Sequence, residues 1–209
     1  IDMPPKQKYS ADEILSAALD LVRHHGLAAL TIRNVAQSLD ISTQPVISCF
    51  KNSAALHEAV WKSVNDIHGR YLMTFDGSDP EEIPLQIGLN YIRFATEEPH
   101  LFQLLFLSGP GPGGIQSLAG LTEDPELKPM LEAMAQGGGI SLEQMQSLFR
   151  TLAVYVHGYA CLLAGGLMKS DQEQMKQDLT DFWTIHLNGL ESPEPGQTAS
   201  RTNAEGGRS

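Results

Sequence analysis

The sequence predicts an all-α protein in which an N-terminal three-helix head is joined to a larger helical body. Apolar residues recur at helical spacing, and no convincing run has the period of two that marks a β-strand. Capping signals are also frequent, because Ser10–Glu13 and Ser141–Gln144 both have the S-x-x-E/Q pattern of a capped first turn. A hydrophobic fraction of 42% is enough to build a core from 209 residues.

The first helix begins at Ser10 and ends at Gly26, a residue that commonly stops a helix. Its apolar stripe consists of Ile14, Leu15, Ala18, Leu19 and Val22. Three helices in about forty residues form a head too small to be very stable alone. We therefore expect the head to pack against the next helix, which starts near Ser53 and runs to Leu72.

Residues 31–50 have the spacing of two short helices joined by a tight turn. Thr31 caps the first helix, whose face carries Val35, Ala36 and Leu39 at helical intervals. Asp40 falls at the turn, where a left-handed backbone is expected and Asp tolerates it better than most residues.

The second short helix is capped by Ser42 or Thr43, and Pro45 falls in its first turn, where a missing N–H costs little. Val46 and Cys49 point inward. The outer face then holds Thr43, Gln44 and Ser48. A helix-turn-helix of this kind places one short helix in the major groove of duplex DNA.

Residues 9–60 resemble the DNA-binding domain of the tetracycline-repressor (TetR) family. The residues that match the family pattern are Gly26, Thr31, Ile32, Val35, Ala36, Leu39, Ile41, Ser42, Val46, Phe50 and Leu56. Three positions depart from it: Ile47 replaces the Tyr that usually touches a phosphate, Ser53 replaces a Lys, and Gln44 replaces a Gly.

The resemblance implies a transcriptional regulator, with repression as the default, that binds a palindromic operator in double-stranded DNA as a homodimer. The residues expected to contact DNA are Thr31, Arg33, Thr43, Gln44, Pro45, Ser48 and Lys51. Gln44 is the best candidate for reading a base, since its amide can pair bidentately with adenine. The helix start at Thr31 and the side chain of Lys51 would hold the phosphate backbone.

The net charge of −11 is unevenly distributed. Residues 1–75 carry seven Lys/Arg and seven Asp/Glu, whereas residues 76–209 carry seven and eighteen. A neutral head gives little non-specific affinity, because phosphate neutralisation drives that part of DNA binding. We expect sequence-specific, salt-sensitive binding.

The boundaries divide the chain into a head at 1–52, a regulatory and dimerisation body at 53–190, and a polar, disordered tail at 191–209. Body helices are expected at 80–97, 100–108, 125–136, 141–168 and 171–190. The Asp79–Pro80 and Asp124–Pro125 pairs would start two of these helices. Gly- and Pro-rich loops are expected at 108–121 and 136–139.

The last two helices carry surplus apolar surface, which suits a four-helix dimer interface. The expected interface residues are Val156, Tyr159, Leu163, Leu167, Phe182, Trp183 and His186. The alternative is that these helices cover the core of their own protomer. His157–Gly158 and the earlier segments 91–94 and 98–102 also resemble the WHG type of TetR regulatory domain, although the Trp of that type has no counterpart here.

A regulator of this plan needs a cavity for a small, largely apolar effector. The residues expected to line it are Phe94, Phe102, Phe106, Met130, Met134, Phe149 and Tyr155, with Tyr91, Gln103 and His157 as polar groups. Met suits an adaptable apolar pocket. Each of these residues has an ordinary core position as its alternative.

Catalysis is not expected, because no nucleophile setting and no phosphate-binding loop after a strand occurs. The histidines lack metal-ligand spacing, so neither a metal nor a cofactor is expected.

Cys49 and Cys161 are predicted to be buried free thiols. The apolar run 152–168 is predicted to be a core helix rather than a membrane span, which indicates a cytoplasmic protein.

The alternative to a DNA-binding regulator is a ligand- or protein-binding dimer whose head has lost DNA affinity.

Overall fold

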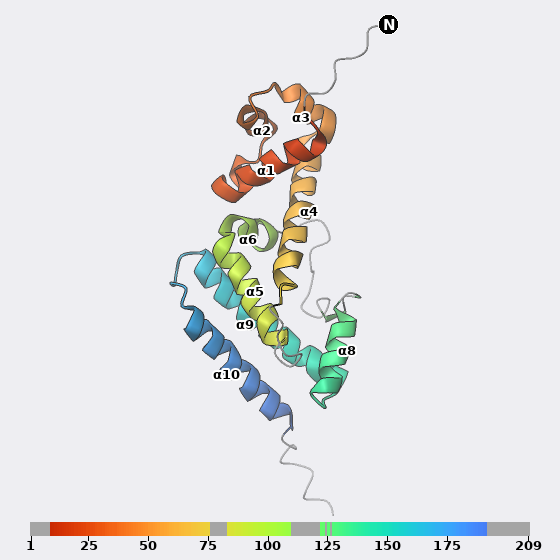
Figure 1. The fold of residues 1–209 in the computed structure, drawn as a ribbon, viewed down its shortest axis with the longest axis vertical. Helices are drawn as coiled ribbons and strands as arrows, with labels where there is room; N and C mark the ends of the chain where they lie inside the picture. The colour runs from red at the N-terminus through yellow and green to blue at the C-terminus, as the bar shows by residue number, and fades with distance from the viewer. Residues whose placement is uncertain (1–8, 76–82, 110–121, 124, 126, 192–209) are drawn as a thin grey trace, which may run out of the picture.

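The computed structural model describes residues 9–75, 83–109, 122–123, 125 and 127–191, and within these the fold is all-α, as predicted. The helices are α1 (Ala11–His25), the 3₁₀ turn η1 (Leu27–Ala29), α2 (Ile32–Ser38), α3 (Thr43–Phe50), α4 (Ser53–Leu72), α5 (Ile83–Glu97), α6 (Pro99–Phe106), α8 (Lys128–Gly137), α9 (Leu142–Ala164) and α10 (Gln172–Glu191). Figure 1 shows them in an elongated molecule.

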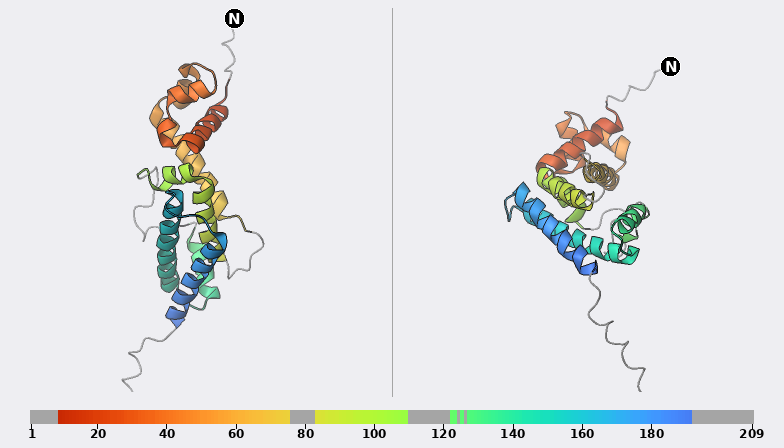
Figure 2. Two further views of the ribbon diagram at one scale, coloured as in Figure 1. Left: turned by 90° about the vertical axis from the view of Figure 1, so that its left-hand side faces the viewer. Right: turned by 60° about the horizontal axis from the view of Figure 1, so that its bottom comes forward.

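The three helices α1, α2 and α3 form a head at one end, and α4 runs from this head into the body (Figure 1). The two further views in Figure 2 show the same separation, with α5, α9 and α10 lying side by side in the body. α8 packs against α9 at the end remote from the head. Long α4 is therefore the main connection between the two parts.

Local signals in the sequence explain where the helices begin and end. The predicted box at the start of α1 is confirmed: the Ser10 amide donates to the Glu13 carboxylate (2.7 Å), and the Glu13 amide donates to Ser10 Oγ (3.2 Å). Gly26, at φ 75°, ends this helix. The same reciprocal pair, Ser141 and Gln144, starts α9.

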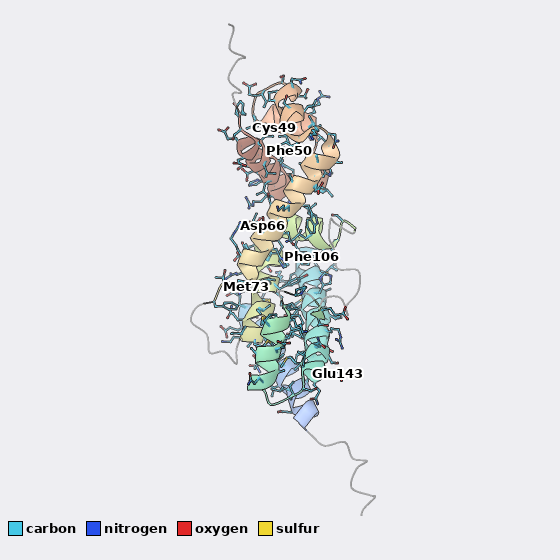
Figure 3. All side chains as sticks on the ribbon, turned by 90° about the vertical axis from the view of Figure 1, so that its right-hand side faces the viewer. Cys49, Phe50, Asp66, Met73, Phe106 and Glu143 are labelled. Carbon is cyan, nitrogen blue, oxygen red and sulfur yellow. The ribbon has the colours of Figure 1, made fainter. Side chains whose placement is uncertain are left out.

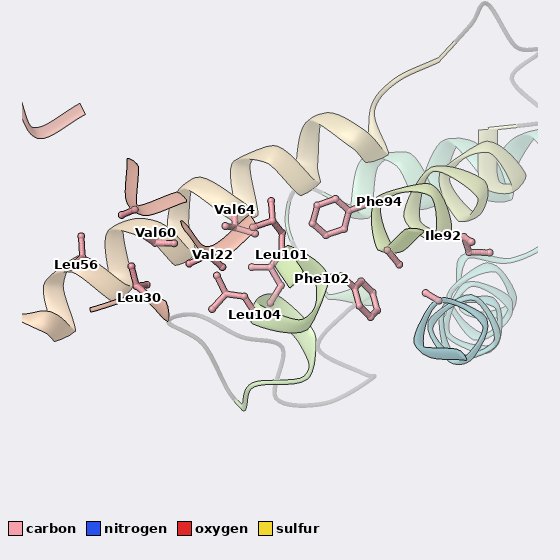
Figure 4. Close-up of a cluster of buried hydrophobic side chains, with 14 of the residues drawn as sticks. Val22, Leu30, Leu56, Val60, Val64, Ile92, Phe94, Leu101, Phe102 and Leu104 are labelled. Atoms are coloured by element: carbon pink, nitrogen blue, oxygen red, sulfur yellow. The ribbon is translucent and has the colours of Figure 1, made fainter. Parts of the chain in front are cut away.

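One continuous apolar core joins the head to the body. Leu56, Val60 and Val64 follow one face of α4 and are all fully buried. Figure 4 shows Val22 beside this row from the head, and Leu101 beside it from α6. The head is thus stabilised by burial against the body, as its small size requires.

Helices α5, α9 and α10 approach one another closely at Gly88 of α5. A Cβ atom at this position would lie 2.9 Å from Leu179 Cδ2 of α10 and 3.2 Å from Val156 Cγ2 of α9. Both of those side chains are buried. Only a residue without a side chain lets α5 fit between α9 and α10 at this distance.

Two predicted helix ends are wrong. The helix expected at 141–168 ends at Ala164, because Gly165 and Gly166 follow and Gly166 adopts φ 67°. Its 23 residues span about 35 Å rather than the length expected for 28. The helix expected from 125 begins at Lys128, and Leu127 provides no side-chain cap.

Some of the remaining predicted helix boundaries agree with the structure, and others lie outside the described residues. α5, α6 and α10 lie within a few residues of their expected positions. The Asp79–Pro80 start and most of the 108–121 loop lie outside the described residues, as do Asp124 of the second start and the tail beyond Glu191. Within the described part, α9 alone has the length and apolar composition to cross a bilayer, and it packs against α5, α8 and α10.

Candidate functional site

The turn of the helix-turn-helix has the predicted geometry. Asp40 adopts φ 53°, the left-handed conformation expected there. Beside it, the Ile41 amide donates to the Ala36 carbonyl (2.9 Å), and the Tyr9 hydroxyl donates to the Leu39 carbonyl (3.2 Å). At the start of α2, the Asn34 amide donates to Thr31 Oγ1 (3.1 Å). The first of these bonds closes the turn between α2 and α3, the second ties the segment before α1 to that turn, and the third caps α2.

The second short helix, α3, presents a polar outer face. Val46 is fully buried, and Cys49 is only half-buried rather than enclosed. Ser48 Oγ donates to the Gln44 carbonyl (2.9 Å), so its hydroxyl is engaged with its own helix. Gln44 and Ile47 are exposed, which places Ile47 on the surface where the family pattern has Tyr.

All seven predicted DNA-binding residues lie in the head, at the end of the molecule farthest from α8. Figure 3 shows Cys49 and Phe50 at this end and Glu143 at the other. Each of the seven predicted DNA-binding residues except Pro45 has an exposed side chain. Lys51 ends α3 with φ 63°, directly after the outer face.

Five of the ten predicted ligand residues gather in one aromatic cluster built from α5, α6 and α9. Its members are Tyr91, Phe94, Phe102, Phe106 and His157. Neighbouring ring centroids lie 5.1 Å apart for Phe102 and Phe106, and 5.9 Å for Phe102 and His157. Phe94 and Phe102 are fully buried, so in this structure they form part of the core.

His68 of α4 belongs to this aromatic cluster and was missed by the sequence analysis. Its ring centroid lies 5.4 Å from that of Tyr91, 5.1 Å from Phe94 and 5.1 Å from Phe106. Its Nε2 is buried and has no hydrogen-bond partner among the described residues. The spacing could have revealed it, because His68 continues the four-residue repeat of the buried row on α4.

Burial lowers the pKa of His68 to about 4, so this ring is neutral at physiological pH. Burial also lowers the pKa of His157 and raises that of Tyr91. The Tyr91 hydroxyl and His157 Nδ1 form a hydrogen bond of 2.8 Å, in which the tautomer of the ring sets the donor. His157 Nε2 lies 3.5 Å from Cys161 Sγ, which completes a short polar chain inside the apolar cluster.

The stability of the protein is expected to fall as the pH drops through the window between 6.5 and about 4. The unfolded chain protonates His68 near pH 6.5, whereas the folded chain does so only near pH 4. The free energy of unfolding therefore has its full value above pH 6.5 and decreases as the pH falls from 6.5 to about 4. Between about pH 7.5 and about pH 5 the loss should be about 2 kcal/mol.

Urea unfolding at several pH values measures this dependence. The variant His68→Phe should show a much smaller slope, with a remainder from His157, whose pKa is lowered in the same sense. The exposed control His25→Phe should keep the wild-type slope. An unchanged slope in His68→Phe would show that another group carries the titration.

The other predicted ligand residues lie elsewhere. Met130 and Met134 line a separate cavity of about 470 Å³ between α5, α8, α9 and α10, with Trp183 in its wall. Phe149 packs against the apolar cluster around α8. Tyr155 stacks on Phe182 of α10 at 4.5 Å. Gln103 lies half-buried on α6.

The predicted interface residues are divided between core and surface. Val156 is only 4% exposed and packs toward Gly88, so it belongs to the protomer core. Trp183 lines the 470 Å³ cavity. Phe182 and His186 stack at 4.0 Å. Tyr159 and Leu163 are half-buried, and Leu167 is exposed.

Three exposed apolar side chains on α9 and α10 were not among the predicted interface residues. Val154, Leu162 and Ile185 are 52%, 45% and 67% exposed. Val154, Gly158 and Leu162 follow one another at four-residue spacing along the outer side of α9. Helical spacing could have separated this outer stripe from the buried stripe that contains Val156.

Comparison with known proteins agrees with this architecture. Residues 85–190, which span α5 to α10 and just over half of the chain, match the family model described as Tetracyclin repressor-like, C-terminal domain. No curated protein sequence matches the chain.

Solved structures show the same fold over most of the chain. A TetR-like transcriptional regulator from Rhodococcus sp. RHA1 is 16% identical, with a TM-score of 0.60 over 90% of this chain and 100% of that one. A TetR variant from Acinetobacter baumannii AYE in complex with minocycline is 15% identical, with a TM-score of 0.55 over 88% and 97%. Apo ActR from Streptomyces coelicolor is 18% identical, with a TM-score of 0.53 over 91% and 99%.

A helix-turn-helix head followed by an all-α body is the architecture of a transcriptional regulator. The chain belongs to the TetR family of such regulators. The matched family model does not specify the WHG type, so that subtype stays a prediction.

Proposed function

We propose that this TetR-family protein is a cytoplasmic repressor that binds a palindromic operator as a homodimer and is released by a small, largely apolar effector. The observation that carries the proposal is the exposed face of α3. Gln44 stands in the first turn of that helix with its side chain in solvent. The N-terminal residues of a recognition helix are those that reach base edges. No catalytic step is part of this proposal.

Gln44 reads a base, and the flanking groups hold the backbone. Its amide can donate to and accept from adenine, whereas Thr43 and Ser48 can contact bases or phosphates. Arg33 and Lys51 are exposed and supply positive charge close to the outer face. Because the head is otherwise neutral, these few contacts give binding that depends on sequence.

The variant Gln44→Ala is expected to weaken binding to the preferred operator by about 1–3 kcal/mol, because the bidentate amide contact is lost. Binding to random DNA should change little, since that affinity comes from phosphate contacts. The measurement is a mobility shift on an operator selected from a random DNA pool, with shuffled competitor, at two salt concentrations. Gln37→Ala, which removes an exposed amide from α2, is the matched control.

An equal loss on operator and random DNA would refute the base-reading role of Gln44. So would an equal loss in Gln37→Ala. A selected operator with two inverted half-sites, about one helical turn or somewhat more apart, would support the palindromic dimer.

The proposed dimer forms through the outer sides of α9 and α10. Exposed Val154, Leu162 and Ile185 give these helices an apolar surface that water would otherwise contact. Gly158 lies between the first two and allows another helix to approach closely, since nothing lies within 4 Å of its absent side chain. A two-fold axis at this face would carry the two heads on the same side.

The proposed effector occupies the body and changes the separation of the two heads. The cavity beside Met130 and Met134 has about 470 Å³, within the usual range for small-molecule sites, and flexible methionines can adapt to an apolar guest. The Acinetobacter relative in complex with minocycline supports a small-molecule role for a body of this fold. With the heads displaced, the dimer can no longer meet both half-sites.

A ligand- or protein-binding dimer without operator affinity is the second candidate function. The observation that favours it is Ile47, which is 38% exposed on α3 at the position of the phosphate-contacting Tyr. Ser53 likewise starts α4 without the usual Lys. A folded dimer that gives no DNA shift even at low salt, and selects no operator from the pool, would establish this alternative.

A further inference from the structure

A cleft of about 600 Å³ lies where the head meets the body, between α1, α4 and α5. It shares no lining residue with the cavity beside Met130 and Met134. Three arginines line it, one from each helix: Arg23, Arg70 and Arg93. Arg23 belongs to the head and Arg70 and Arg93 to the acidic body, so the three cations meet where the two parts join.

The three arginines differ in what they already bind. Arg23 is paired with Glu98 at 2.9 Å and with Asp20 at 3.1 Å. Arg93 has a buried Nε without a hydrogen-bond acceptor in the described part of the chain, and its guanidinium carbon lies 5.4 Å from the Tyr71 ring centroid. Arg70 is exposed and forms no ion pair with a described residue.

The acidic residues of the cleft are engaged with their neighbours. Glu98 pairs with Arg23, and Glu97 accepts a hydrogen bond from the Tyr71 hydroxyl at 2.9 Å. Asp20 and Glu98 hold Arg23, whereas Arg70 and Arg93 have no ion-pair partner among the described residues. The positive charge of these two arginines suits a guest with one negative charge, whereas a second negative charge would be repelled by Glu97 and Glu98.

Leu19 and Ile67 contribute apolar surface to the same cleft, and Tyr71 adds a ring. A guanidinium presents a planar fork of donors that matches a carboxylate bidentately. Arg93 lines the cleft and has no ion-pair partner among the described residues, so its guanidinium can take such a carboxylate.

We propose that this cleft binds a small organic monocarboxylate with an aromatic or aliphatic body. The carboxylate lies between Arg93 and Arg70, and the apolar part packs against Leu19 and Ile67. The site is separate from the DNA-contacting face and from the proposed effector cavity, so the proposal does not rest on either of them.

Such a ligand would contact the head and the body at once. Arg23 belongs to α1, and its backbone carbonyl is bonded to His100 Nδ1 at 2.9 Å at the start of α6. Its side chain also holds Glu98, directly before α6. The apolar part of the ligand packs against Leu19, one turn before Arg23 on α1, and so lies beside this attachment of α1 to the body.

The test is isothermal titration calorimetry of the full-length chain, without DNA, with 2-naphthoate as the probe and neutral 2-naphthamide as its uncharged counterpart. The wild type should bind one 2-naphthoate per chain and should bind the amide at least tenfold more weakly. Arg70→Met and Arg93→Met should each weaken 2-naphthoate binding at least tenfold. Arg93→Lys keeps the charge without the fork and should fall between.

Two control variants locate the binding. Lys176→Met alters a neighbouring cleft of about 340 Å³ that also contains Arg93, and Met134→Trp fills the apolar cavity. Both should bind 2-naphthoate as the wild type does. Arg70 is exposed, so its variant keeps the fold, and circular dichroism checks this for Arg93→Met.

The proposal is overturned if the wild type gives no binding heat at millimolar 2-naphthoate, or if acid and amide bind equally. It is also overturned if Arg70→Met binds normally while Lys176→Met or Met134→Trp does not, because the probe would then occupy another cavity. DNA binding by the same preparation is a separate readout, so failure here leaves the proposed repressor function standing.

Discussion

Replacing Phe102 with alanine is expected to lower the free energy of unfolding by about 3–5 kcal/mol, the largest stability effect we predict for one side chain. Phe102 is fully buried. Its ring centroid lies 5.1 Å from that of Phe106, 5.8 Å from Tyr91 and 5.9 Å from His157. These neighbours come from three helices, so the cavity left by the ring cannot easily close.

Equilibrium unfolding in urea, followed by circular dichroism, measures the effect. Phe102→Leu keeps much of the volume and should cost less than Phe102→Ala. Phe75→Ala removes the same ring from an exposed position after α4 and should change stability little. If Phe102→Ala unfolded within about 1 kcal/mol of the wild type, the aromatic cluster would be loosely packed rather than part of the core.

The second large effect is expected from Leu162→Glu, which should convert the proposed dimer into monomers. Leu162 is 45% exposed in the protomer, so the variant should fold normally. In the dimer it would bury a charge in an apolar interface, which is costly without a partner. Sedimentation velocity should show the mass fall to that of one 22.8 kDa chain.

Loss of the dimer should also weaken operator binding by about 100-fold or more, because the two heads would no longer bind as a linked pair. Asn65→Glu adds the same charge to an exposed position of α4 and serves as the control. A Leu162→Glu protein that remains dimeric at low concentration would place the interface elsewhere on the molecule.

The head could be predicted because its signals are local. The capping box at Ser10, the Thr31 cap and the left-handed turn at Asp40 are each set by residues within a few positions of one another. Local backbone preferences of this kind do not depend on which distant helices pack together, and the structure confirms all three.

The candidate ligand residues were less predictable, because their grouping depends on how distant helices pack. Met134 and Tyr155 have the same apolar character as Phe102, but α8 and the outer part of α9 carry them away from the aromatic cluster. His68 was missed for the opposite reason. It is polar by type, but its place on α4 brings it among the rings of α5 and α6.

The dimer-interface residues could not be predicted from the apolar pattern of α9 alone. Both sides of α9 carry apolar residues, and spacing alone does not say which side α5 covers. The structure places Val156 inside and Val154 outside, although only two positions separate them. Gly88 suits this arrangement, because its missing side chain leaves room for Val156 and Leu179.

Because α4 is long, a small tilt at one end of this helix produces a larger displacement at its other end. The part of α4 from Ser53 to His68 extends about 24 Å from the head to the aromatic cluster, where His68 is held among the rings. A tilt of about 5° at His68 displaces the other end by about 2 Å. A small rearrangement of the side chains around His68 would therefore move the head far enough to break a hydrogen bond there.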